Sequence, residues 1–132
     1  MKILQVRVYH SFGLINGITF QIDSNSIQIQ FSDNAGIKEA FRAYQEFERD
    51  NGPEPALPGL PYSSRQLFWI SAANIWCGKY RPEVLKLRVQ VGSHSPAQFR
   101  VVGTVSNLQE FADTFNCPAG SPMYPLNRCA VW

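Results

Sequence analysis

The sequence predicts a mainly α-helical fold for most of this 132-residue chain. Residues 67–77 are apolar on nearly every side, which is typical of a helix in a protein interior. Residues 33–50 carry apolar side chains at helical spacing, and a shorter helical pattern follows residue 105. Residues 1–31 differ, because their apolar and polar residues alternate with the period of a β-strand. We therefore expect a helical protein preceded by a less regular segment with strand character.

Composition narrows the class of protein and of partner. Apolar residues make up 45% of the chain and charged residues 17%, which is typical of one globular domain or part of one. The net charge of +2 comes with no basic block, so we expect no nucleic-acid partner. The N-terminus begins like a signal peptide, but Gln5, Arg7 and His10 interrupt it, so no targeting segment is predicted. A bilayer span needs about 20 apolar residues, so residues 67–77 are too short to be one.

The segment before residue 32 reads as short strands joined by turns. Strand-like alternation occurs in residues 6–8, 18–22 and 27–31. Residues 16–17 and 23–26 have the Asn, Gly, Asp and Ser content of turns.

The first predicted helix runs from residue 33 to about residue 50. Asp33 or Asn34 is expected to cap its start. Gly52 can take the left-handed conformation that ends a helix, and Pro53 prevents continuation. Its apolar face is predicted to contain Ile37, Ala40, Phe41, Tyr44 and Phe47.

A proline-rich connector leads to the central helix. The four prolines in residues 53–61 predict a stiff, extended segment. Ser63 and Gln66 then have the spacing of a capping box, so we expect the central helix over residues 66–83.

The pattern after the central helix is less regular. Pro82 suits the first turn of a helix, whereas the alternation in residues 85–91 favours a strand, and the residues alone leave both open. Ser106 and Gln109 have the spacing of a second capping box, which predicts a short helix. Its apolar face is predicted to contain Leu108, Phe111, Ala112 and Phe115.

Few residues are candidates for chemistry by type alone. His94 lies in the polar loop 92–96, and Arg100 follows six residues later. Together they could polarise a carbonyl and hold a carboxylate, although a loop histidine and a surface arginine are usually solvated or structural residues. Asp33 at a predicted helix start is by default a cap. The cysteines Cys77, Cys117 and Cys129 are odd in number, and this pattern fits either reduced thiols or partners elsewhere. Their spacing does not indicate a zinc site.

From residue 33 onward, the chain resembles the C-terminal end of the neprilysin and endothelin-converting-enzyme family of zinc metalloendopeptidases. The longest matching piece is Ile-Trp-Cys-Gly-Lys-Tyr-Arg-Pro-Glu at residues 75–83. The other pieces occur in family order, at residues 33–37, 43–44, 57–60, 66–68, 94–96, 99–101, 111–112, 115–117, 122–125 and 129–132. The resemblance implies the thermolysin-like helical lobe of such an enzyme.

The resemblance also implies roles for five residues. Asp33 matches the aspartate of the family's Glu-x-x-x-Asp motif, which orients a zinc-bound histidine. His94 matches the histidine that donates a hydrogen bond to the developing oxyanion. Arg100 matches the arginine that holds a substrate carbonyl or carboxylate. Ile75 and Trp76 match part of the apolar pocket for the substrate residue after the scissile bond.

The chain departs from the family in the zinc-binding part. The family's His-Glu-x-x-His motif is not present, since the two histidines are His10 and His94. The third ligand should be a glutamate four residues before Asp33, but that residue is Ile29. We therefore expect residues 1–31 to be foreign to the family and residues 32–132 to belong to it. A truncated gene model, an alternative transcript or a degenerate copy could each produce such a chain.

These observations predict a C-terminal fragment of a zinc endopeptidase that hydrolyses peptides. We expect zinc in the complete enzyme and no metal in this chain, which alone should be inactive. Cys77, Cys117 and Cys129 match halves of disulfides whose partners lie elsewhere in the family's sequence. By family the enzyme belongs at the cell surface, facing outward. The alternatives are a non-catalytic peptide-binding module or decoy and, more remotely, an unrelated helical domain.

Overall fold

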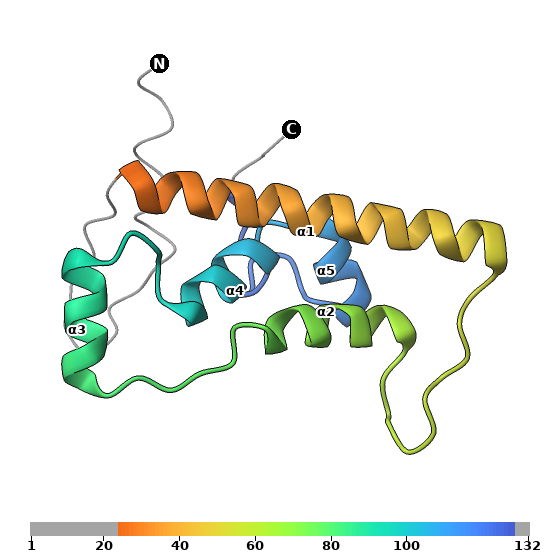
Figure 1. Ribbon diagram of the computed structural model, residues 1–132. Coiled ribbons are helices and arrows are strands. Elements are labelled where there is room, and N and C mark those ends of the chain that lie inside the picture. Colours follow the sequence, from red (N-terminus) through yellow and green to blue (C-terminus); the bar gives the residue numbers. More distant parts are fainter. Residues whose placement is uncertain (1–23, 129–132) are drawn as a thin grey trace.

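Five helices form the part of the chain that the computed structural model describes, which is residues 24–128 (Figure 1). The helices are α1 (Ser24–Asn51), α2 (Ser64–Asn74), α3 (Pro82–Val91), α4 (Ala97–Val105) and α5 (Gln109–Phe115). Within residues 24–128 the β-structure is limited to an isolated bridge between Ser121 and Tyr124. The predicted mainly α fold is therefore confirmed.

The long helix α1 lies along one side of the molecule, and shorter helices lie beneath it (Figure 1). Helix α4 packs against α1, and α5 packs against α2. Helix α3 lies at one end, separated from α2 and α4 by non-helical segments. This arrangement places the start of α4 near the N-terminal half of α1.

Aromatic side chains fill the interior between α1, α2 and α5. Phe41 and Trp69 are each 2% exposed, and their ring centroids are 4.6 Å apart. We call the whole group the aromatic core: Phe41, Tyr44, Phe68, Trp69, Phe111 and Phe115. Its neighbouring ring centroids lie 4.6–6.3 Å apart, the range of favourable aromatic pairs. The indole N–H of Trp69 donates to the Thr114 hydroxyl at 3.3 Å, so the one polar group of this ring has a partner.

The helical spacing predicted for the first helix is confirmed, but its predicted start is wrong. Phe41 is buried and Tyr44 packs against the core, whereas Phe47 is 47% exposed. Helix α1 begins at Ser24, so residues 24–31 are neither a turn nor a strand, and neither Asp33 nor Asn34 is a cap. Extending an existing helix adds one hydrogen bond per residue, and residues 24–32 contain no proline or glycine to stop it.

The central helix is shorter than predicted. The Ser63–Gln66 capping box is confirmed, with the two reciprocal hydrogen bonds at 3.2 and 3.0 Å. Helix α2 ends at Asn74, however, and residues 78–81 are not helical. Arg81 is extended, with ψ 148°, because the ring of Pro82 disfavours a helical conformation in the residue before it.

Residues 82–91 form a helix, which decides between the two alternatives that the sequence left open. Pro82 occupies the first turn, as one of those alternatives predicted. The second predicted capping box is wrong. Leu108 precedes α5 without a side-chain cap, and Ser106 instead follows the end of α4.

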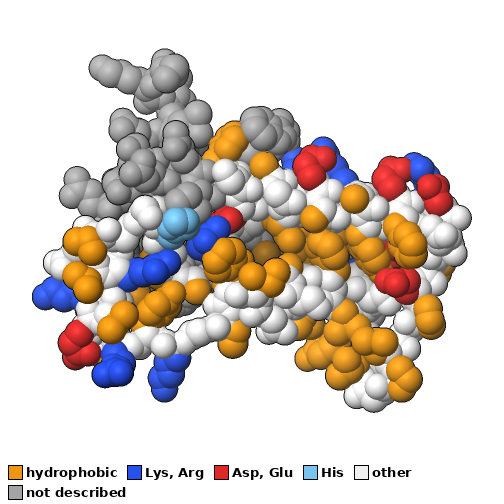
Figure 2. All heavy atoms as spheres, viewed as in Figure 1, with side chains coloured by type: hydrophobic (Ala, Val, Ile, Leu, Met, Phe, Trp, Pro, Cys, Tyr) orange, Lys and Arg blue, Asp and Glu red, His pale blue; other side chains and the backbone are white. Residues whose placement is uncertain are grey.

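The connector between α1 and α2 exposes apolar side chains. Leu57, Leu60 and Tyr62 are 42–54% exposed, and Figure 2 shows apolar side chains gathered on this protruding loop. None of the helices between residues 24 and 128 is long and apolar enough to cross a membrane. The predictions for residues 1–23 and for Cys129 lie outside the described residues.

Candidate functional site

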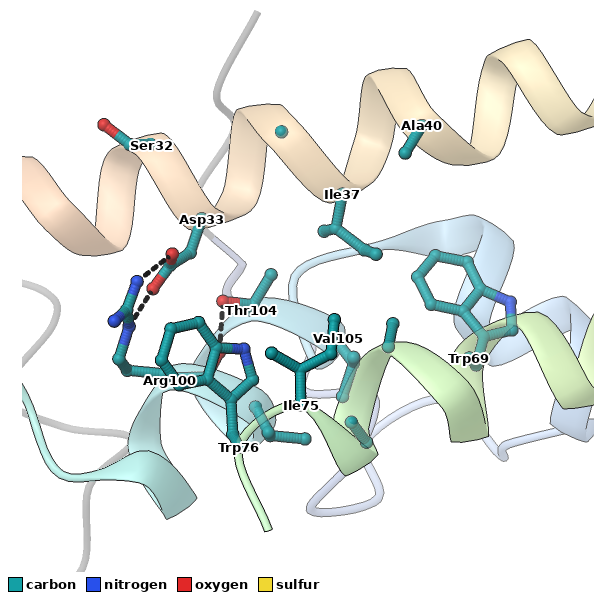
Figure 3. A pocket seen from close by; sticks show the side chains of 14 residues that line it. Ser32, Asp33, Ile37, Ala40, Trp69, Ile75, Trp76, Arg100, Thr104 and Val105 are labelled. Atoms are coloured by element: carbon teal, nitrogen blue, oxygen red, sulfur yellow. Dashed lines mark hydrogen bonds and ion pairs between the residues drawn. The ribbon is translucent and has the colours of Figure 1, made fainter.

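A pocket of about 250 Å³ lies between α1, the end of α2 and α4 (Figure 3). Four of the residues singled out in the sequence line it: Asp33, Ile75, Trp76 and Arg100. The other lining residues are mostly apolar or small: Ser32, Gly36, Ile37, Ala40, Trp69, Ala72, Ala73, Val101, Thr104 and Val105. Residues distant in sequence therefore meet at one apolar cavity with a charged end.

The charged end is an ion pair between Arg100 on α4 and Asp33 on α1. Arg100 Nε donates to Asp33 Oδ2 at 2.7 Å, and Arg100 Nη2 donates to Asp33 Oδ1 at 2.5 Å. The two side chains are only 12% and 17% exposed. Two parallel, charge-assisted hydrogen bonds in a largely buried position fix both direction and distance.

Trp76 covers one face of the Arg100 guanidinium. The guanidinium carbon lies 3.6 Å from the ring centroid, well within the range of a cation–π interaction. The tryptophan backbone is fixed by the last turn of α2, where Trp76 N–H donates to the Ala73 carbonyl at 3.0 Å. Arg100 is therefore held by Asp33 along one edge and by Trp76 across one face.

The rest of the pocket is apolar. Trp69 stands at the end opposite the ion pair, and Ile37 projects between them from α1 (Figure 3). Ile75 is 75% exposed, so it forms part of the rim and not of the floor. Such a cavity suits an uncharged, bulky side chain, because apolar walls have no partners for a buried charge.

His94 does not line this pocket. It is exposed in the loop between α3 and α4, and its Nδ1 lies 2.9 Å from the Ser93 hydroxyl. The following residues Ser95 and Pro96 are buried, which anchors the loop at its junction with α4. Four of the five predicted active-site residues therefore meet, and His94 stays on an adjoining loop.

Thr104 belongs to the site but was not identified from the sequence. Its hydroxyl donates to the Arg100 carbonyl at 2.6 Å, and the side chain lines the pocket. The sequence could have indicated Thr104 through its position four residues after Arg100, because this spacing places both residues on one face of a helix.

The described residues do not fit a zinc ion. No group of three or more His, Cys, Asp or Glu side chains between residues 24 and 128 could hold a metal. Both oxygens of Asp33 accept hydrogen bonds from Arg100. Cys77 is an exposed free thiol and Cys117 a partly buried one.

Comparison with known proteins identifies the family. Residues 5–131 match the family described as Peptidase family M13. This chain belongs to peptidase family M13. The resemblance drawn from the sequence motifs is therefore confirmed, and M13 peptidases are zinc metallopeptidases. The match begins at residue 5, ahead of the boundary at residue 32 that the motifs predicted.

Curated M13 relatives support the same assignment. The chain is 47% identical over 118 residues to Neprilysin-2 of Drosophila melanogaster, which covers 89% of the chain and 14% of the relative. It is 41% identical to human Neprilysin over 118 residues, or 89% of the chain and 15% of the relative. It is 48% identical over 101 residues to the Endothelin-converting enzyme homolog of Locusta migratoria, covering 76% of the chain and 14% of the relative. The chain thus spans 14–15% of the length of these relatives.

Proposed function

We propose that this M13 chain forms the substrate-binding side of an endopeptidase active site and holds the peptide beside the bond to be cleaved. The observation that carries the proposal is the position of Arg100 at the charged end of an apolar pocket. An arginine has five N–H donors, and Asp33 takes two of them. The remaining donors are available for a peptide carbonyl, while Ile75 and Trp76 receive the side chain of the residue after the scissile bond.

His94 and Asp33 have complementary roles in this proposal. His94 donates a hydrogen bond to the oxyanion that develops at the attacked carbonyl. Donors of this kind are typically worth about 10²–10³ in rate. Asp33 also orients a histidine ligand of the zinc, which its carboxylate can do alongside Arg100 because two oxygens offer about four acceptor positions.

The zinc ligands and the general base are proposed to lie outside residues 24–128, since no metal-binding group occurs there. Cys77, Cys117 and Cys129 would form disulfides with cysteines in other parts of the complete enzyme. By family we place the enzyme at the cell surface, with peptides as its substrates.

A second function, peptide binding without catalysis, is favoured by one specific observation. The pocket and its ion pair are built entirely from residues 32–105 of this chain. A peptide could therefore bind here without any other part of an M13 peptidase.

Titration of the purified 132-residue chain with N-acetyl-Gly-Phe-Gly-amide tests these proposals. We expect saturable shifts of the Trp76 and Arg100 backbone amide signals in NMR spectra. The Arg100→Met variant should bind at least about tenfold more weakly, because hydrogen bonds from charged groups contribute roughly 1.5–3 kcal/mol. The Leu87→Ala variant, altered on α3 away from the pocket, should bind like the wild type.

Peptide hydrolysis is measured in the same samples with added zinc. We expect no cleavage above the buffer blank from the chain alone. Zinc-dependent cleavage would contradict the proposal that the zinc ligands lie elsewhere. Failure of the wild-type chain to bind the peptide would contradict the assignment of the pocket.

A further inference from the structure

The guanidinium of Arg100 is restrained by two groups of different character. Asp33 contacts its edge through two hydrogen bonds of 2.7 and 2.5 Å, and Trp76 covers its face at 3.6 Å (Figure 3). The acid and the ring come from α1 and from the segment just after α2, respectively. These are separate elements, so each can be altered without removing the other.

The contact with Asp33 leaves one motion of the arginine unrestrained. Rotation about the second side-chain torsion of an aspartate is soft, because a torsion between sp³ and sp² atoms has broad minima. The carboxylate and the guanidinium could therefore swing together and keep both hydrogen bonds. The long arginine side chain would allow this, since its several rotatable bonds are free to change until other contacts fix them.

We infer that Trp76 is a positioning residue that blocks this swing and sets the plane of the Arg100 guanidinium. The inference rests on the proposed function, in which Arg100 binds the peptide. Two hydrogen bonds fix the backbone on either side of the ring, from Trp76 N–H to the Ala73 carbonyl and from Cys77 N–H to the Asn74 carbonyl, both at 3.0 Å. The backbone of Arg100 is held by a hydrogen bond that the Thr104 hydroxyl donates to the Arg100 carbonyl, at 2.6 Å.

The plane of the guanidinium decides where the Arg100 N–H donors that Asp33 does not bind can point. Guanidinium N–H bonds lie in the plane of the group, so a ligand oxygen must approach in that plane. If Trp76 holds the plane, these donors are aimed before the ligand arrives, and less entropy is lost on binding. A tryptophan that only filled space would contribute apolar contact area and would leave the aim of the donors unchanged.

Three forms of the chain separate these two roles. Trp76→Met keeps an apolar side chain of some length without a ring, and Trp76→Phe keeps a smaller ring. Leu87→Ala on α3 is the control for a change of an apolar side chain outside the pocket. The first readout is the NMR signal of the Arg100 Nε–Hε group, which depends on the ring and not on any ligand.

We expect the wild-type signal to be shifted upfield by the ring and protected from exchange with water. Trp76→Met should lose the upfield shift and show a lower ¹⁵N order parameter for Arg100 Nε–Hε, because the guanidinium and the carboxylate then swing together with their hydrogen bonds intact. Trp76→Phe should lie between the wild type and Trp76→Met. An Arg100 Nε–Hε order parameter that is the same in Trp76→Met and the wild type would overturn the inference. If Trp76→Met does not fold, as judged by its circular dichroism, the comparison of Trp76→Phe with the wild type decides in the same way.

The second readout compares two probes that fill the pocket, N-acetyl-Gly-Phe-Gly-amide and butylbenzene. Butylbenzene offers no carbonyl to Arg100. Positioning predicts that Trp76→Met weakens the peptide about fivefold more than it weakens butylbenzene, and that Trp76→Phe restores part of the difference. Equal weakening of both probes would show a space-filling role and overturn the inference. If the wild-type chain binds no peptide, the proposed function fails, and the Arg100 Nε–Hε order parameters alone decide the role of Trp76.

Discussion

The aromatic core and the pocket share helices α1 and α2 but are stabilised in different ways. In the core, α1 contributes Phe41, which is 2% exposed and in contact with aromatic rings on α2. Eight residues earlier on α1, Asp33 is paired with Arg100 at the charged end of the pocket. The aromatic core is therefore stabilised by close packing of buried rings. The pocket leaves a cavity unfilled, and an ion pair fixes the positions of the side chains at its charged end. Trp69 belongs to both and separates them.

The largest effect on this comparison should come from removing a core ring. We expect Phe41→Ala to lower the free energy of unfolding by about 3–5 kcal/mol, because the ring is fully buried and leaves a cavity. Urea unfolding followed by circular dichroism measures the change. Phe47→Ala on the same helix is the control, and its 47% exposed ring should contribute less than about 1 kcal/mol. Equal effects of the two substitutions would show that the core is not where the stability lies.

A smaller effect is expected at the pocket end. Asp33→Asn should lower the free energy of unfolding by about 1–3 kcal/mol, because it leaves the largely buried Arg100 without its counter-charge. The double variant Asp33→Asn/Arg100→Met should be less destabilised than the sum of the two single variants. Urea unfolding of all four forms gives the coupling between the residues. Simple additivity would contradict the view that the pocket depends on a paired charge.

The smallest effect concerns the rim of the aromatic core and depends on pH. Burial, followed by the hydrogen bond from the Tyr44 hydroxyl to Glu54 and the negative charge of Glu48, raises the pKa of Tyr44 from 10.0 to about 12. The folded state therefore favours the protonated hydroxyl. The resulting stabilisation is fully present below pH 10 and is lost as pH rises towards 12, where the folded state also ionises.

Unfolding experiments at pH 9, 10 and 11 with the wild type and Tyr44→Phe test this expectation. The stability advantage of the wild type over the variant should shrink as pH rises. The comparison removes the contribution of other groups that titrate in the same range. A constant difference would mean that the Tyr44 hydroxyl is not protected by the fold.

Sequence patterns predicted helices well where one face is buried. Ile37, Phe41 and Tyr44 follow the helical period because they pack on the core. The alternation that suggested strands in residues 85–91 has a different origin. No residue of α3 is buried, so its pattern does not report which side faces an interior. The end of α2 at Asn74 was missed, although Pro82 indicated that Arg81 must be extended.

Residue patterns predicted the helices better than they predicted the site. Asp33 and Arg100 are 67 residues apart in sequence, and their contact depends on how α4 packs against α1. No local spacing contains that information. The resemblance to a peptidase family predicts that both residues belong to one active centre. The contact of Trp76 with Arg100 emerged only from the three-dimensional arrangement.

The exposure of helix α3 affects the order in which parts of the molecule unfold. Three of its five aliphatic residues, Val84, Leu87 and Val91, are 48%, 58% and 74% exposed, and none of the five is fully buried, so opening the helix removes little packing. The backbone amides of α3 should therefore exchange with deuterium through local opening, at a free-energy cost far below that of global unfolding. The amides around Phe41 should exchange only when the whole chain unfolds. Within residues 24–128, we therefore expect α3, which leads into the His94 loop, to open while the helices that line the pocket stay folded.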